Sequence, residues 1–95
     1  MTFTAKIERM NDDGGWYIVR IPSETVQKLR AAAHKKGNIP VLCHIGKSEW
    51  SSTIMSMGEQ QWFVAVKAAI RQAERIDEGD NIVIDIRPDA TRLPA

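Results

Sequence analysis

The sequence lacks features that identify disulfide-bonded, membrane-spanning and secreted proteins. It contains one cysteine, Cys43, so no disulfide can form within the chain, as suits a reducing compartment. It has no run of about 18 apolar residues, the length that a membrane-spanning helix requires. Its polar start, "MTFTAKIERMNDD", lacks the apolar core of a signal peptide. We therefore expect a cytoplasmic protein that does not enter a membrane.

The sequence also lacks a strong excess of one charge. Thirteen basic and 12 acidic side chains leave a formal net charge of +1, whereas domains that bind duplexes usually carry a marked basic excess. We therefore expect no nucleic-acid partner. The chain has 95 residues, 43% of them apolar and 26% charged, which is an ordinary composition for one small globular domain.

Short extended segments dominate the remaining pattern. Period-two alternation, shown best by Ile82, Ile84 and Ile86, is typical of strands with one buried face. Turn residues such as "NDDGG" and "GK" separate these segments. The pattern predicts strands at 2–10, 16–21, 40–45, 48–55, 61–66 and 81–86, with an amphipathic helix at 23–37 and a short helix of strong helix formers at 67–75.

These elements favour a mainly β fold. Six short strands and two short helices, without the long spacing of βαβ units, predict a small closed β-barrel rather than a doubly wound sheet. The sequence shows no repeat and no linker. We expect one barrel domain over residues 1–88 and a flexible C-terminal tail over 89–95.

The order of several motifs resembles one known family. "VRIP" at 19–22, "GNIPVLCHIGKSEWSSTIMSMG" at 37–58, "VKAAIR" at 66–71 and "EGDNIVIDI" at 78–86 are similar to the bacterial family called domain of unknown function 1905. The resemblance covers about residues 3–88 and implies a closed barrel of about six strands. It implies no catalytic residue. This chain departs from the family in the fuller helical pattern after Pro22, and in Glu59 and Gln60 where many members have glycines. The second departure argues against a phosphate-binding loop there.

The acidic turn "DEGD" has two interpretations. Gly79 can adopt positive φ and Asp80 can accept hydrogen bonds from the amides of the turn, so both are typical of a structural corner before a strand. Asp77, Glu78 and Asp80 could instead bind a hard cation, but the other ligands of a calcium loop are missing. We expect the structural corner and no metal site.

The sequence contains no recognisable catalytic set. His34 and His44 form no metal-binding motif with the single cysteine. Adjacent residues of a strand point to opposite faces, so Cys43 and His44 do not form a dyad. Cys43 is expected to pack as a small apolar residue and His44 to face outwards. We expect no enzyme activity, no catalytic residue and no cofactor.

Four residues are candidates for binding a ligand: Arg71, Trp50, Met57 and Gly58. Arg71 follows Lys67 by four residues, and its fork suits either an anion or an ion pair with Glu78 or Asp80. Trp50 could form an aromatic floor, although core packing is its ordinary role. Trp16 and Trp62 are expected to be partly exposed.

We therefore expect a non-catalytic binding or interaction module that is a monomer or a weak homodimer. Its partner is an unknown small ligand or protein, received at the end of the barrel near Arg71 and the 56–60 loop. A nucleic-acid-binding barrel and a small enzyme are the alternatives, the first by analogy of fold alone.

Overall fold

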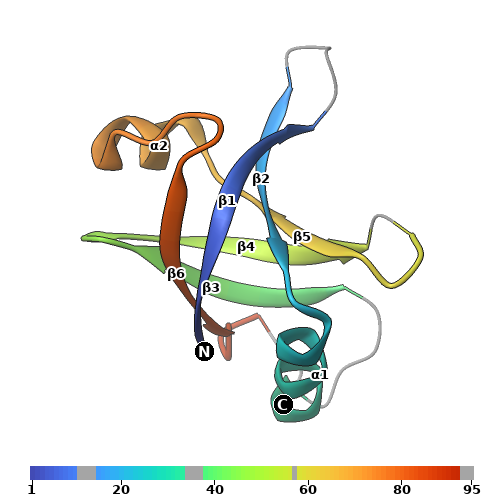
Figure 1. Ribbon diagram of the computed structural model, residues 1–95. Helices are drawn as coiled ribbons and strands as arrows, with labels where there is room; N and C mark the ends of the chain where they lie inside the picture. Colours follow the sequence, from blue (N-terminus) through green and yellow to red (C-terminus); the bar gives the residue numbers. More distant parts are fainter. Residues whose placement is uncertain (11–14, 34–37, 57, 93–95) are drawn as a thin grey trace.

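Six antiparallel strands close into a barrel, which confirms the predicted fold class (Figure 1). The computed structural model describes residues 1–10, 15–33, 38–56 and 58–92. The strands are β1 (Thr2–Met10), β2 (Trp16–Ile21), β3 (Ile39–Ile45), β4 (Ser48–Ser56), β5 (Trp62–Ala65) and β6 (Asn81–Pro88), and the helices are α1 (Ser23–Ala33) and α2 (Ala68–Glu74). Around the barrel the order is β1-β2-β5-β4-β3-β6.

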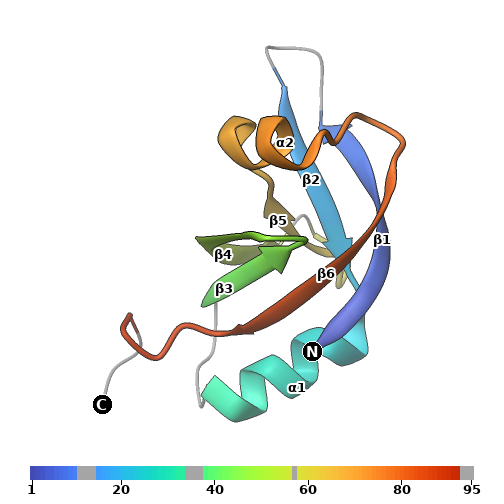
Figure 2. The same cartoon turned by 90° about the vertical axis from the view of Figure 1, so that its left-hand side faces the viewer.

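The last strand joins the two halves of the sheet. β6 pairs with β1, with Phe3 opposite Ile84, and on its other edge with β3, with Cys43 opposite Ile86. Figure 2 shows this long strand beside β1. The join between β4 and β5 is narrower, because only Met55 opposite Phe63 and Ser56 opposite Trp62 are paired there.

Alternating side chains fill the barrel. The predicted inward residues of β6, Ile82, Ile84 and Ile86, are 9%, 0% and 0% exposed. They pack in one cluster with side chains from the other strands, including Ile7, Val19, Val41, Cys43, Trp50, Ile54 and Val64. Burying each such aliphatic side chain contributes roughly 1.5–3 kcal/mol, so this interior is the main source of stability.

Helix α1 closes one end of the barrel (Figure 1). It begins at Ser23 directly after Pro22, as predicted, and buries Val26 and Leu29 against the core. The structure follows it to Ala33, and the predicted continuation to Gly37 lies outside the described residues. No helix among the described residues is both long enough and apolar enough to span a bilayer.

The chain after β6 is held against the barrel at least to Arg92, whereas we expected a flexible tail from residue 89. Asp89 is only 2% exposed, and its carboxylate accepts hydrogen bonds from Thr91 and from Arg92 Nε at 2.8 Å. The guanidinium of Arg92 also donates to the carbonyl oxygens of Val41, at 3.2 Å, and of Ser52. Residues 93–95 of the predicted tail lie outside the described residues.

Candidate functional site

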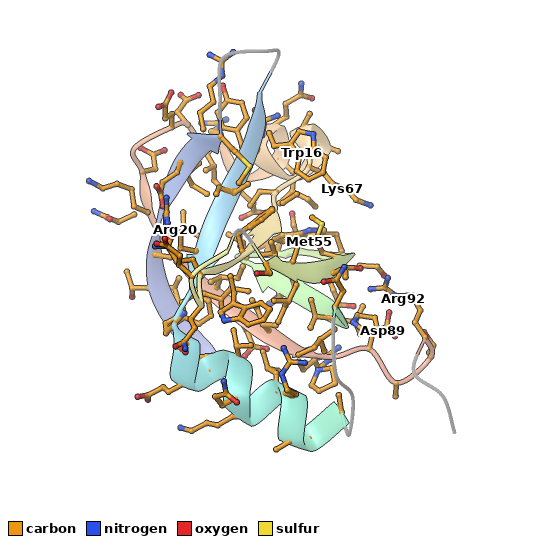
Figure 3. All side chains as sticks on the ribbon, turned by 90° about the vertical axis from the view of Figure 1, so that its right-hand side faces the viewer. Trp16, Arg20, Met55, Lys67, Asp89 and Arg92 are labelled. Atoms are coloured by element: carbon orange, nitrogen blue, oxygen red, sulfur yellow. The ribbon has the colours of Figure 1, made fainter. Side chains whose placement is uncertain are left out.

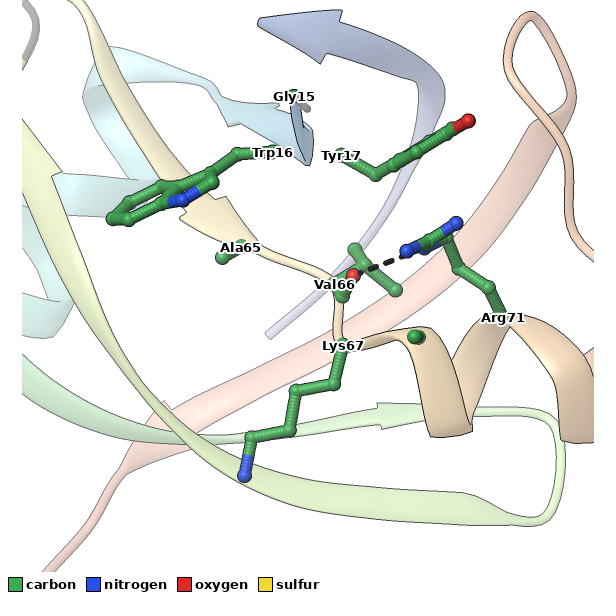
Figure 4. A pocket seen from close by; sticks show the side chains of 8 residues that line it. Gly15, Trp16, Tyr17, Ala65, Val66, Lys67 and Arg71 are labelled. Carbon is green, nitrogen blue, oxygen red and sulfur yellow. Dashed lines mark hydrogen bonds between the residues drawn. The ribbon is translucent and has the colours of Figure 1, made fainter. Parts of the chain in front are cut away.

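A pocket of about 190 Å³ opens at the end of the barrel opposite α1, where β2 and β5 meet the start of α2 (Figure 4). Its walls come from three short segments. The lining residues are Gly15, Trp16, Tyr17, Ala65, Val66, Lys67, Ala68 and Arg71.

Backbone hydrogen bonds fix the floor of this pocket. β5 ends at Ala65, but the next residue continues its pairing, because the amide of Val66 donates to the carbonyl of Tyr17 at 2.8 Å. Beneath the pocket, Trp50 Nε1 donates to the carbonyl of Ala65 at 3.2 Å. The floor is therefore held by hydrogen bonds of the protein itself, and such preorganisation lowers the entropic cost of binding.

The guanidinium of Arg71 packs on an aromatic ring. Its Cζ lies 3.6 Å from the centroid of the Tyr17 ring, and its Nε donates to the carbonyl of Val66 at 3.3 Å (Figure 4). A second cation, Arg9, lies 6.0 Å from the same ring. The contact with the Tyr17 ring and the hydrogen bond to Val66 hold Arg71 in one orientation at the wall of the pocket. The cation–π attraction contributes about 0.5–2 kcal/mol.

The prediction that Arg71 forms an ion pair with Glu78 or Asp80 is wrong. None of the ion pairs between described residues involves Arg71. The arginine turns instead towards β2, where Tyr17 offers a ring face next to the Val66 carbonyl. The short distance in sequence between Arg71 and the acidic turn therefore did not identify the partner of Arg71.

Trp16 and Lys67 form the exposed rim of the pocket. The Trp16 side chain is 55% exposed, one of the few large apolar groups at the surface, and Lys67 is also exposed (Figure 3). Trp16 and Tyr17 are adjacent on β2, so their rings point to opposite sides of the strand (Figure 4). The lining thus combines an open indole face with the two cations of Lys67 and Arg71, and it includes no carboxylate.

The four predicted ligand-binding residues are not gathered at one place. Arg71 lines the pocket, whereas Trp50 is 5% exposed and belongs to the core beneath it. Gly58, with φ +89°, lies in the loop before β5, while the pocket lies at the other end of that strand (Figure 1). Met57 lies outside the described residues. Ligand binding at these positions stays a prediction.

The acidic turn holds β6 in place. Gly79 has φ +90°, and its amide donates to the carbonyl of Ile7 at 2.8 Å. The carboxylate of Asp80 accepts a hydrogen bond from the Asp77 amide at 2.9 Å, and its backbone carbonyl accepts one from the Ile7 amide. These contacts are those of the predicted structural corner. Among the described residues, no cluster of His, Cys, Asp or Glu could hold a metal ion.

Cys43 is fully buried in β3, as predicted, and His44 beside it faces outwards. Burial raises the pKa of the Cys43 thiol from 9.0 to about 12. The thiolate is the reactive form of cysteine, so Cys43 stays protonated and unreactive near neutral pH. His34 lies outside the described residues.

Seven of the eight lining residues, all except Arg71, were not among the predicted ligand-binding residues. Tyr17 was read only as a strand residue, and Ala65 offers no chemistry of its own. The expected partial exposure of Trp16 and Trp62 is confirmed, since Trp16 is exposed and Trp62 half-buried. Arg71 and the expected exposure of Trp16 beside a glycine turn were the two signals in the sequence that pointed towards this end of the barrel.

Comparison with models of protein families assigns this chain to a family. A family model described as "Domain of unknown function (DUF1905)" matches residues 3–86, which is most of the chain. A search of curated proteins gives no match. The matched residues include every lining residue of the pocket.

Proposed function

The chain belongs to the DUF1905 family of domains of unknown function, and from this premise we propose that it is a non-catalytic binding module. Its ligand is a small anion that also carries an apolar group, and it binds in the pocket between Trp16 and Arg71. The observation that supports this proposal most is a pocket lined by an exposed indole and two cations, over a floor that hydrogen bonds hold in place. Concave sites that combine an apolar wall with a few fixed polar groups are typical ligand sites.

The chemistry of the lining supports binding rather than catalysis. The eight residues include no carboxylate, imidazole or thiol, the groups that most often act as general bases or nucleophiles. One face of the Tyr17 ring is covered by the Arg71 guanidinium. Of the acids in and after α2, Glu74 accepts a hydrogen bond from the Ser48 hydroxyl at 2.6 Å, and those of the 77–80 turn bond to their own backbone or lie at the surface.

Binding can be tested by recording two-dimensional NMR spectra of the ¹⁵N-labelled protein with a panel of small anions, nucleotides and peptides. We expect at least one compound to shift the Trp16 indole and the Lys67 and Arg71 signals together. Lys67→Gln should weaken that response, whereas Lys28→Gln, the same change of charge on exposed α1, should not. If no compound shifts the pocket signals, or if all shifts gather elsewhere, the proposal is wrong.

One observation favours a second candidate function, binding of single-stranded nucleic acid. Arg9 and Arg71 lie against the Tyr17 ring, and Lys67 and Trp16 line the pocket beside it; cations together with aromatic rings are the usual platform for bases. The net charge of +1 argues against it. Binding of a labelled oligonucleotide that weakens steeply between about 50 and 200 mM salt would support this candidate, and no binding at low salt would exclude it.

A further inference from the structure

We propose that one edge of β4, over residues 49–53, binds an extended acidic peptide of a partner protein, which adds a strand to the barrel there. This free edge is a different surface from the pocket, and its occupant goes beyond the small ligand proposed for the pocket. Three properties of the edge lead to this partner: its pairing stops early, the backbone groups of alternate residues point out of it, and the charges beside it are positive.

β4 is paired along the whole of one edge and along little of the other. Towards β3, every residue of Ser48–Ile54 has a partner. Towards β5, only Met55 and Ser56 have one, and Figure 1 shows β5 leaving β4 on its way to α2. Within the part of the chain that the structure describes, residues 49–53 therefore have no strand on the β5 side.

The register shows which backbone groups face the free edge. Pro40 lies opposite Thr53, and proline has no N–H, so this pair is one of those without mutual hydrogen bonds. Such pairs alternate with bonded pairs in an antiparallel ladder, so the backbone groups of Thr53, Ser51 and Glu49 all point away from β3. Met55, the next residue of this series, is the one that pairs with β5 on the same edge.

The backbone groups of these three residues are open to a partner. Glu49 and Ser51 are exposed and Thr53 is half-buried. None of the backbone hydrogen bonds that described residues form outside their strands involves any of the three. An edge with open donors and acceptors at alternate positions is the template to which an extended peptide adds a strand. The span of 49–53 corresponds to a peptide of about five residues.

The barrel's own elements bound the free edge at both ends. At the end of β4, Met55 lies opposite Phe63 of β5. At its start, the hydroxyl of Ser48 donates a hydrogen bond to the carboxylate of Glu74 on α2 at 2.6 Å. A second copy of the barrel would bring its own β5 and α2 against those of the first, whereas a single extended chain needs only the space beside 49–53. The edge therefore suits a peptide rather than a second copy.

Two lysines flank the free edge. Lys47 directly precedes β4, and Lys67 would lie opposite Ser51 if the register of β4 with β5 continued. Both lysines are exposed, and neither takes part in an ion pair between described residues. The acid of the edge, Glu49, is already paired with Arg87 at 3.0 Å. An acidic residue at the centre of the peptide would therefore face an uncompensated positive charge.

The inner side of the edge limits the size of the peptide's other side chains. Residues opposite each other on neighbouring strands share a face, so the second and fourth residues of an antiparallel peptide share the inner face with Ser52 and Trp50. Trp50 is 5% exposed, and its indole already bonds to the carbonyl of Ala65. Small side chains are therefore required at these two positions.

The free edge can be tested first without a peptide, by hydrogen exchange of the ¹⁵N-labelled full chain. The amides of Glu49, Ser51 and Thr53 should exchange about tenfold or more faster than those of Trp50 and Ser52, which bond to β3 in the same strand. Equal protection of the two sets would overturn the proposal. Protection of the first set that rises with protein concentration would assign the edge to a second copy and would overturn it as well.

The binding test uses blocked five-residue peptides in NMR titrations. The peptide VAEAV has small residues at positions 2 and 4 and an acid at position 3, and we expect a Kd on the order of 1 mM. Its binding should slow the exchange of the three edge amides. The peptide VAKAV should bind about fivefold more weakly. Methylation of the backbone nitrogens at positions 1, 3 and 5 should weaken binding about tenfold, whereas methylation at positions 2 and 4 should weaken it less.

Variants of the protein check the same contacts. Lys67→Gln should reduce the preference for VAEAV over VAKAV, whereas Lys28→Gln on exposed α1 should not. Ser51→Pro removes an edge amide that β3 does not use, so it should weaken binding about tenfold, and circular dichroism shows whether this variant folds. Trp16→Leu changes the pocket and should leave peptide binding as it is.

The outcomes are independent of those for the pocket. If VAEAV does not shift the edge amides at millimolar concentration, or if methylation at positions 1, 3 and 5 has no effect, the free edge is not a peptide site. The same holds if VAKAV binds as tightly as VAEAV, because the acidic class is then wrong. None of these results changes the response of Trp16 and Arg71 to small anions, on which the proposed function depends.

Discussion

The indole Nε1 of Trp50 donates a hydrogen bond to the carbonyl oxygen of Ala65 at 3.2 Å, between two strands that have already separated. Pairing of β4 with β5 stops at Met55 opposite Phe63. Beyond that point a side chain, not a strand, satisfies the Ala65 carbonyl. Trp50 therefore holds the end of β5 in position under the pocket that we assign to ligand binding.

Replacement of this donor should cost stability. We expect Trp50→Phe to lower the free energy of unfolding by about 1–3 kcal/mol, because a partly buried carbonyl loses its partner and the smaller ring leaves a gap. Urea denaturation measures this difference. The matched control is Trp16→Phe at the exposed rim, which should change stability by less than about 0.5 kcal/mol. Equal effects of the two variants would contradict the assigned role of Trp50.

Arg71 should contribute to stability as well as to the pocket. Arg71→Ala removes the contact with the Tyr17 ring and the hydrogen bond to Val66, so we expect a loss of about 1–2 kcal/mol in urea denaturation. Arg87→Ala is the control, since it removes only a surface ion pair with Glu49, worth at most about 1 kcal/mol. A loss no larger than that of the control would mean that the stacking on Tyr17 is not stabilising.

The corner before β6 allows a test of backbone conformation alone. Gly79 and Gly58 have nearly the same φ, +90° and +89°, and a Cβ at either would meet no neighbour within 4 Å. Gly79 is tied to β1 through its amide, whereas the hydrogen bonds of Gly58, to Ser56 Oγ and from the Gln61 amide, stay within its own exposed loop. We expect Gly79→Ala to lower stability by about 1–3 kcal/mol and Gly58→Ala by less. The reverse order would show that the corner does not constrain β6.

The contacts of Asp89 should make the fold sensitive to acid. Hydrogen bonds from Thr91 and then from Arg92 lower the pKa of Asp89 below its ordinary value of 3.8. The folded state therefore binds fewer protons than the unfolded chain, and these contacts contribute their full stability above pH 3.8 and lose it as the pH falls through the lower folded value. A hydrogen bond from the N-terminal ammonium lowers the pKa of Asp85 in the same direction.

Asp89→Asn should reduce stability near neutral pH and flatten its decline in acid. Thermal unfolding followed by circular dichroism between about pH 2 and 7 measures both effects, since that range spans the ordinary carboxyl pKa. Glu24→Gln, the same loss of charge on exposed α1, should leave the pH profile as it is. A profile of Asp89→Asn that is parallel to the wild type would exclude Asp89 as a source of the acid sensitivity.

The fold could be predicted because its determinants are local. Alternation in 81–86 identifies a strand whatever its neighbours are, and the turns at Gly46 and Gly79 mark where β3 ends and where β6 begins. Pro22 followed by Ser23 placed the start of α1 correctly. The order of these local signals was sufficient for the resemblance to the family that the whole-chain match supports.

The candidate site and the C-terminal contacts could not be predicted, because they depend on long-range geometry. Arg92 bonds to carbonyl oxygens of Val41 and Ser52, which are 51 and 40 residues away in sequence. Backbone carbonyls are present everywhere and leave no pattern in a sequence. Arg71 illustrates the same limit, since an acidic turn close in sequence looked a better partner than the ring of Tyr17 on a distant strand.

The central position of β6 also constrains how this protein can be made in a cell. Its two edges join β1 and β3, so in a nascent polypeptide that has not yet reached residue 81 each of these strands can pair on one edge only, β1 with β2 and β3 with β4. On a translating ribosome the earlier hairpins would wait with unpaired edges, within reach of chaperones or of other nascent chains, until the final segment emerges and the cylinder closes in one late step.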